Sequence, residues 1–242
     1  MNDTRWDFRD RVVLVTGVGR TGQIGHAVAR AFGVAGARIV ICDRDAVAVA
    51  ERAREFVADG IEARPAAGDL TEPDVAHLAV EMALRHFGRL DVVVNVAGGL
   101  TTYGPIGQTT EQDFDREIAI NLKTTFLVSQ AAVEQLVRTE GCIVNVASIA
   151  YVQPTSPMAV YVAAKSAVAG FTRSLAHELR DRRVRVNAIA PAMVRTTDNV
   201  ASAGAGAQYV EMDHIADGIL FLASPAAAAI TGHILPITRG QI

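Results

Sequence analysis

The sequence has 242 residues, half of them hydrophobic, and a formal net charge of −3. A chain of this length suits one domain with a large core, and the lack of a basic block argues against a nucleic-acid partner. No apolar run is long enough to span a membrane, and the charged N-terminus MNDTRWDFRD lacks the apolar stretch of a secretory signal. We therefore expect residues 1–242 to form a single cytoplasmic domain without a membrane partner.

Short apolar runs recur along the chain and predict strands. They are continuous rather than alternating, which is typical of parallel strands buried on both faces. A weaker run at 61–67, IEARPAA, contains Pro65 and is expected at a sheet edge. The other runs are RVVLVTG, RIVICD, DVVVNVAG, CIVNVAS, VRVNAIAP and HILPI.

Helical patterns fill the intervals between these runs. We predict helices at 24–35, 46–58, 73–87, 111–138, 158–180 and 213–223. Regular strand–helix alternation implies right-handed crossovers between parallel strands. The predicted fold is α/β, a doubly wound seven-stranded parallel sheet of the Rossmann type, which binds ligands at the carboxyl ends of its strands.

The stretch TGVGRTGQIG at 16–25 suggests a phosphate-binding loop, although it contains neither GxGxxG nor GxxxxGK[ST]. It follows the first predicted strand and opens the first predicted helix. In that context glycines let the backbone approach a pyrophosphate, and the helix N-terminus offers unpaired N–H groups. The alternative is an ordinary glycine-rich turn.

Asp43, at the end of the second predicted strand, favours the dinucleotide interpretation. A carboxylate there can accept both ribose hydroxyls of an adenosine and repel a 2′-phosphate, so it indicates NAD rather than NADP. Arg20 in the loop could instead pair with a 2′-phosphate. We predict NAD as the cofactor, because a fixed carboxylate beside a phosphate is costly.

Tyr161 and Lys165, in YVAAK, lie one helical turn apart and share a face. Of 23 basic residues, only Lys123 and Lys165 are lysines. Unlike a guanidinium, an ammonium is compact and has a tunable pKa. We expect the Lys165 ammonium to lower the pKa of Tyr161 from its usual value near 10, which would make the phenol a usable base.

With Ser148 at the end of CIVNVAS and Asn121 in IAINLKTTF, the chain resembles the short-chain dehydrogenase/reductase family over nearly its whole length. Asn121, Ser148, Tyr161 and Lys165 match the family's Asn-Ser-Tyr-Lys tetrad. TGVGRTGQIG looks like its TGxxxGxG loop with two residues inserted. NVAG stands where the family usually has NNAG, and PAMVRT is similar to its PGxxxT segment.

The resemblance implies an oxidoreductase that transfers a hydride between NAD(H) and a secondary alcohol or ketone. Tyr161 would be the general acid/base, and Ser148 would polarise the substrate oxygen. Lys165 would hydrogen-bond the nicotinamide ribose, and Asn121 would hold a water that passes protons from Lys165.

Cofactor contacts are expected along the carboxyl edge of the sheet, with Asp69 of GDL near the adenine. The six histidines show no metal-ligand spacing, so we expect no metal. The expected contact residues are Gly17, Arg20, Gly22, Ile24, Gly25, Asp43, Asp69, Leu70, Asn95, Ala97, Gly98, Tyr161, Lys165, Pro191, Val194 and Thr196.

The resemblance also implies a homotetramer. Apolar residues of the segments 111–138 and 158–180 fall on more than one side of a helix, and a helix that is apolar all round must be covered twice. We therefore expect these two helices to pair across a two-fold axis. Examples on the second segment are Val160, Val168, Phe171 and Leu175.

The chain departs from the family pattern in its loop insertion, in Val96 and Ala192, and in a short lid at about 197–212. Small residues dominate this lid, so we expect it to bury little apolar surface. Two alternatives to an NAD-dependent dehydrogenase stay open. One is an NADPH-dependent 3-oxoacyl-type ketoreductase, in which Arg20 outweighs Asp43, and the other is an inactive dinucleotide-binding regulatory protein.

Overall fold

The computed structural model describes residues 6–240 and is built on one seven-stranded sheet. The strands are β1 (Val12–Thr16), β2 (Arg38–Asp43), β3 (Ala63–Ala67), β4 (Val92–Asn95), β5 (Cys142–Val146), β6 (Arg185–Pro191) and β7 (Ile234–Ile237). Their order is β3-β2-β1-β4-β5-β6-β7, and every pairing is parallel. The strand order therefore reverses between β1 and β4, where sheets of this type bind ligands.

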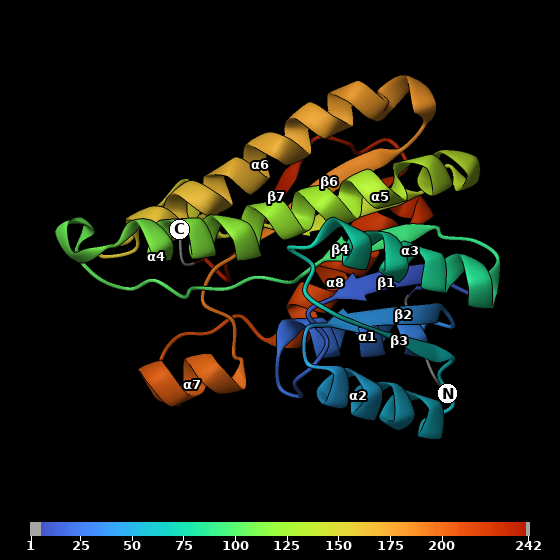
Figure 1. Cartoon of the computed structure of the whole chain (residues 1–242), viewed down its shortest axis with the longest axis horizontal. Coiled ribbons are helices and arrows are strands. Elements are labelled where there is room, and N and C mark those ends of the chain that lie inside the picture. The colour runs from blue at the N-terminus through green and yellow to red at the C-terminus, as the bar shows by residue number, and fades with distance from the viewer. Residues whose placement is uncertain (1–5, 241–242) are drawn as a thin grey trace.

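Eight α-helices accompany the described strands. They are α1 (Ile24–Val34), α2 (Ala46–Ala58), α3 (Pro73–Phe87), α4 (Glu111–Ile118), α5 (Thr124–Thr139), α6 (Ala159–Leu179), α7 (Thr197–Ala203) and α8 (Met212–Ala223). Helices α1, α2 and α8 cover one face of the sheet, and α3, α5 and α6 cover the other (Figure 1). Helix α7 projects from the body of the molecule (Figure 1).

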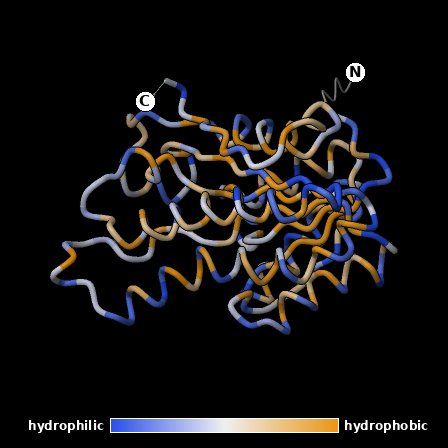
Figure 2. The backbone as a smooth tube through the Cα atoms, turned by 90° about the horizontal axis from the view of Figure 1, so that it is seen from above, coloured by the Kyte–Doolittle hydropathy of each residue, from blue (hydrophilic) through white to orange (hydrophobic). Residues whose placement is uncertain are grey.

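The two faces of the sheet explain the continuous apolar runs. In β1, Val13 and Val15 belong to the core cluster that includes α1, α2 and α8, whereas Val12 and Leu14 belong to the cluster on the opposite side. All five residues of this strand are buried. Successive strand side chains point to opposite faces, so a sheet covered twice needs apolar residues at every position. Figure 2 shows the hydrophobic residues concentrated in these central strands.

The structure confirms the predicted fold class, including the edge position of β3 with Pro65. The helix predicted at 111–138 is instead divided into α4, a π-helical turn at Ala119–Lys123 and α5. Side chains compete with the main-chain ladder at this point. Asn121 donates from Nδ2 to the Glu117 carbonyl oxygen at 3.0 Å, and Thr125 donates from Oγ1 to the Asn121 carbonyl oxygen at 2.9 Å.

Helix α6 does not carry the uncovered apolar side chains that were expected. Val160, Val168 and Leu175 are buried within the single chain, and Phe171 packs edge-on against Phe126 with 6.1 Å between ring centres. The expectation was wrong for the three buried residues, since Val168 packs with Ala147 and Ala188 and Leu175 belongs to the core cluster that joins the sheet to α3 and α5. No helix within residues 6–240 is both long and apolar enough to cross a membrane.

Candidate active site at the carboxyl edge of the sheet

The loop between β1 and α1 folds closely on itself. A Cβ at Gly25 would lie 2.1 Å from the Gly17 carbonyl oxygen, and Gly17 itself has a φ of +75°. Helix α1 begins after Gln23 without a side-chain cap and without an acidic residue in its first turn. Its first N–H groups therefore lack side-chain acceptors, and a helix N-terminus of this kind suits a pyrophosphate.

Asp43, the last residue of β2, is held against this loop. Its Oδ2 accepts a hydrogen bond from the Gly19 main-chain N–H at 2.7 Å, and its Oδ1 accepts from the Asp45 N–H at 3.1 Å. A Cβ at Gly19 would lie only 2.6 Å from the carboxylate carbon. Each carboxylate oxygen has further acceptor capacity, so the group fits the two hydroxyls of a ribose.

Two residues of the glycine-rich loop, Arg20 and Gly22, contact the lid. Arg20 forms an ion pair with Asp198 of α7, at 2.7 Å between Nη2 and Oδ2, and the Gly22 carbonyl oxygen accepts from the Thr197 N–H at 2.9 Å. Both side chains of the ion pair are exposed, so it contributes little to stability. Arg20 is thus directed toward the lid.

The other expected cofactor contacts lie in neighbouring loops, with one exception. Asn95 is buried in the sheet, where its Nδ2 donates to Ser129 at 3.1 Å and to Asn145 at 2.9 Å, and Asn145 donates to Thr172. This polar network joins β4 and β5 to α5 and α6. The network fixes the sheet beneath the site. Asn145 was not among the residues predicted from the sequence.

The remaining contact candidates follow strand ends. Asp69 lies after β3, exposed, and its Oδ1 accepts from the Thr71 N–H at 2.9 Å. Thr16, which the sequence analysis also missed, accepts through Oγ1 from the N–H groups of Val96 and Ala97 and so fixes the loop after β4. The other expected cofactor contacts also lie in loops or at the ends of strands and helices; they are Ile24, Leu70, Ala97, Gly98, Pro191, Val194 and Thr196.

The structure brings the four tetrad residues together. Ser148 follows β5, Tyr161 and Lys165 lie in the first two turns of α6, and Asn121 lies in the π-helical turn. The Ser148 side chain, whose Oγ accepts from the Ala150 N–H at 3.2 Å, lies close enough to Tyr161 to lower the pKa of the phenol. The Lys165 Nζ lies 5.8 Å from the centre of the Tyr161 ring and donates to the Val146 carbonyl oxygen at 2.9 Å.

Burial dominates the titration of this pair. Burial lowers the pKa of Lys165 to about 8. Burial also raises the pKa of Tyr161, and the neighbouring Ser148 side chain opposes this rise only in part. The expectation that Lys165 brings the pKa of Tyr161 below its usual value is therefore wrong for this structure. The ammonium donates to a main-chain carbonyl rather than to the phenol, and withdrawal from water disfavours the tyrosinate.

Asn121 is 1% exposed, and its amide is occupied by protein groups. Its Oδ1 accepts from the Gly99 N–H at 3.1 Å, and its Nδ2 lies within hydrogen-bond distance of the Gly99 carbonyl oxygen and of the Glu117 carboxylate. The predicted water would have to bind beside an amide that already has partners. Glu117, which sequence reasoning missed, lies four residues before Asn121, the spacing of one helical turn.

The lid is anchored by one aromatic residue. Tyr209 and Val210 are buried, and the Tyr209 hydroxyl donates to the carbonyl oxygens of Asn199 at 3.2 Å and Gly204 at 2.7 Å. The expectation of little apolar burial thus holds for exposed residues 201–206 but not for the end of the lid.

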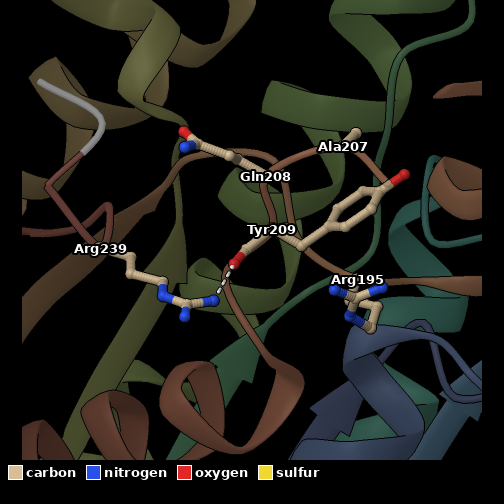
Figure 3. Close-up of a pocket in the computed structure, with 5 residues that line it drawn as sticks. All are labelled: Arg195, Ala207, Gln208, Tyr209 and Arg239. Carbon is tan, nitrogen blue, oxygen red and sulfur yellow. Dashed lines mark hydrogen bonds between the residues drawn. The ribbon is translucent and has the colours of Figure 1, made fainter. Parts of the chain in front are cut away.

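A shallow pocket of about 240 Å³ lies beside Tyr209 and contains no tetrad residue (Figure 3). The guanidinium of Arg195 lies over the Tyr209 ring and pairs with Glu211 at 2.9 Å. Arg239 donates to the Tyr209 main-chain oxygen at 3.5 Å. The pocket is thus part of the lid anchor.

The model of the short chain dehydrogenase family matches residues 11–207. The chain belongs to this family. Among its relatives is D-threitol dehydrogenase of Mycolicibacterium smegmatis, with 34% identity over 97% of this chain and 95% of that protein. The family assignment makes the protein an NAD(P)-dependent oxidoreductase of alcohol and ketone substrates.

Solved structures of short-chain dehydrogenases have the same fold. A short-chain dehydrogenase/reductase from Mycobacterium ulcerans superposes with a TM-score of 0.92 at 32% identity, covering 97% of this chain and 90% of that one. A 7α-hydroxysteroid dehydrogenase in complex with NADH and 7-oxo glycochenodeoxycholic acid gives 0.90 at 27% identity, covering 99% and 97% of the two chains.

Proposed function

We propose that this short-chain dehydrogenase prefers NAD and oxidises a secondary alcohol to a ketone, with Tyr161 as the general acid/base. The observation that carries the cofactor preference is the Asp43 carboxylate, fixed at the end of β2 by the Gly19 N–H at 2.7 Å. The pairing of Arg20 with Asp198 supports it, because an arginine directed to the lid is not placed to receive a 2′-phosphate. This weighs against the NADPH-dependent 3-oxoacyl reductase.

The tetrad supports the chemistry. Bound NAD would supply the hydride acceptor. The Tyr161 oxygen, in its deprotonated form, would then take the alcohol proton and become the phenol, and the Ser148 hydroxyl would hold the substrate oxygen beside it. Lys165 places a positive charge 5.8 Å from the centre of the phenol ring. The names of two related proteins, a D-threitol dehydrogenase and a 7α-hydroxysteroid dehydrogenase bound to a 7-oxo compound, support an alcohol or ketone substrate for this chain.

Replacing Asp43 tests the cofactor preference. Asp43→Ala is expected to weaken NADH binding about tenfold or more, because a hydrogen bond to a charged group contributes about 1.5–3 kcal/mol. NADPH binding should improve at the same time, since the repulsion of the 2′-phosphate is gone. Fluorescence titration with both reduced dinucleotides measures this.

Asp45→Ala is the matched control, because the Asp45 carboxylate caps α2 and does not contact the glycine loop. It should keep the preference for NADH. Adding Arg20→Ala to Asp43→Ala should remove the gain in NADPH binding if Arg20 then turns toward the phosphate. Tighter binding of NADPH than NADH by the unaltered protein would refute the proposed preference.

A homotetramer is the proposed assembly. Phe114 of α4 and Phe126 of α5 are 46% and 42% exposed, and burial of such side chains between copies would be favourable. Light scattering at micromolar concentration should give four times the chain mass, and Phe126→Asp should reduce it. Val47→Asp, at an exposed apolar position of α2, is the control and should not. A monomeric unaltered protein would contradict this assembly.

A further inference from the structure

Glu117 occupies an unusual position in α4. It is the buried residue of this eight-residue helix and has 0% exposure, whereas Phe114 on the same helix is 46% exposed. Glutamate is among the residues least often fully buried, and burying its charge is costly unless partners compensate. The position therefore calls for groups that hold a carboxylate inside the protein.

The carboxylate of Glu117 is surrounded by donors. Its Oε2 accepts from the Thr101 N–H at 2.9 Å, the Thr101 hydroxyl at 2.5 Å and the Thr102 N–H at 2.8 Å. Its Oε1 accepts from the Asn121 Nδ2 at 3.1 Å. The Glu117 carboxylate thus accepts four hydrogen bonds and donates none. This is the pattern of an ionised carboxylate, which has no proton to donate.

The positive charge that acts together with this carboxylate is Lys165. Within residues 6–240, Glu117 forms no ion pair at 4 Å or less with an arginine, a histidine or Lys165, so its charge acts on Lys165 through the protein interior and not through direct contact. Lys165 is 4% exposed, and the charge of Glu117 favours its protonated form, against the burial that lowers its pKa. The same charge favours the protonated form of Tyr161.

Within the described residues 6–240, the hydrogen-bonding and ring contacts of the Lys165 ammonium are with neutral groups. The Val146 carbonyl oxygen accepts its hydrogen bond, and Tyr161 on the same helix lies beside it. From α4, the charged side chains other than Glu117 are at least partly exposed, and Asp113 pairs with Arg116 at 2.5 Å. Among the charged side chains of α4, Glu117 is thus the buried one, and its negative charge acts on Lys165.

We propose that Glu117 is a positioning residue of the proton-transfer site, which orients the Asn121 amide and supplies the negative charge that balances the buried Lys165 ammonium. The inference rests on the proposed function only for the role of Lys165 in proton transfer. Because two charges in one water-poor site determine each other's protonation, removing Glu117 should make Lys165 lose its proton at lower pH.

The two lysines of the chain make this directly measurable. Protein labelled with ¹³C at lysine Cε has two side-chain signals, from Lys123 and Lys165, and Lys123→Arg assigns them. In Glu117→Gln, the Lys165 midpoint is expected to fall by roughly one pH unit or more, the usual effect of losing an opposite charge nearby. The exposed Lys123 should titrate as before.

Thr101→Val is the matched control, because it removes one hydrogen bond from the Glu117 Oε2 but leaves the charge in place. Its Lys165 midpoint should stay near that of the unaltered protein. An unchanged midpoint in Glu117→Gln, or an equal fall in Thr101→Val, would overturn the proposal. The titration needs no substrate, so a negative result would refute the role of Glu117 without refuting the proposed function. The proposed function would be refuted instead by a Tyr161→Phe variant that keeps its activity.

A double-mutant cycle covers the case in which Glu117→Gln does not fold. If the two charges balance each other, Glu117→Gln combined with Lys165→Met leaves neither charge unpaired. The double variant should then resist urea better than the sum of the single losses predicts, or fold where Glu117→Gln does not. Additive losses, or a double variant that stays unfolded, would contradict the proposal.

Discussion

Tyr161→Phe should abolish most NAD-linked turnover while leaving the fold and NADH binding intact. The phenyl ring keeps its place in α6, but the hydroxyl that exchanges a proton with the substrate is gone. General acid–base catalysis contributes roughly 10²–10⁴-fold, and we expect a loss at least this large. The measurement is the rate of NADH formation, with NADH binding followed by fluorescence.

Tyr103→Phe is the control for this loss, since it removes a phenol hydroxyl from a side chain that is 68% exposed. It should keep near wild-type turnover. An active Tyr161→Phe enzyme would mean that α6 does not carry the chemistry.

Lys165→Arg is the second change with a large expected effect. The arginine keeps the positive charge, but its planar guanidinium is larger than the buried ammonium, which is 4% exposed and bonded to the Val146 carbonyl oxygen. It also does not release a proton at working pH. Turnover should fall by roughly 10²–10⁴-fold while part of the NADH affinity remains.

The pH profile separates proton transfer from charge alone. Burial lowers the pKa of Lys165 to about 8, so alcohol oxidation, which needs an acceptor for protons, should rise as pH increases through that value. Lys165→Arg should lose this rise because the guanidinium stays protonated. Lys123→Arg, at the exposed lysine of the chain, should retain both rate and profile. Near-full neutral activity in Lys165→Arg would show that only the charge matters.

The fold could be predicted because its signals are local. Continuous Val- and Ile-rich runs require a sheet covered on both faces, and β1 is buried at all five positions. The tetrad spacing likewise placed Ser148, Tyr161 and Lys165 together. Where side chains compete with the helix ladder, as at Asn121 and Thr125, periodicity failed to predict the π-helical turn.

The missed features depend on contacts between distant segments. Glu117 is buried because residues 101 and 102 donate to it from the loop after β4, and nothing in α4 alone predicts that. The direction of the Tyr161 pKa follows from how deeply the site is buried, not from the Tyr–Lys spacing. The ion pair of Arg20 with Asp198 joins residues 178 positions apart, so no local pattern predicts it. Such effects require the tertiary structure.

The central claim is NAD-linked oxidation of a secondary alcohol by Tyr161. The most direct test is a panel of secondary alcohols, sugars, steroids and dihydrodiols, offered with NAD or NADP and followed by absorbance of the reduced dinucleotide. We predict turnover of at least one panel member, with a higher kcat/KM for NAD than for NADP and none in Tyr161→Phe. Preference for NADP, or no turnover with either dinucleotide from a protein that binds NADH, would contradict this account.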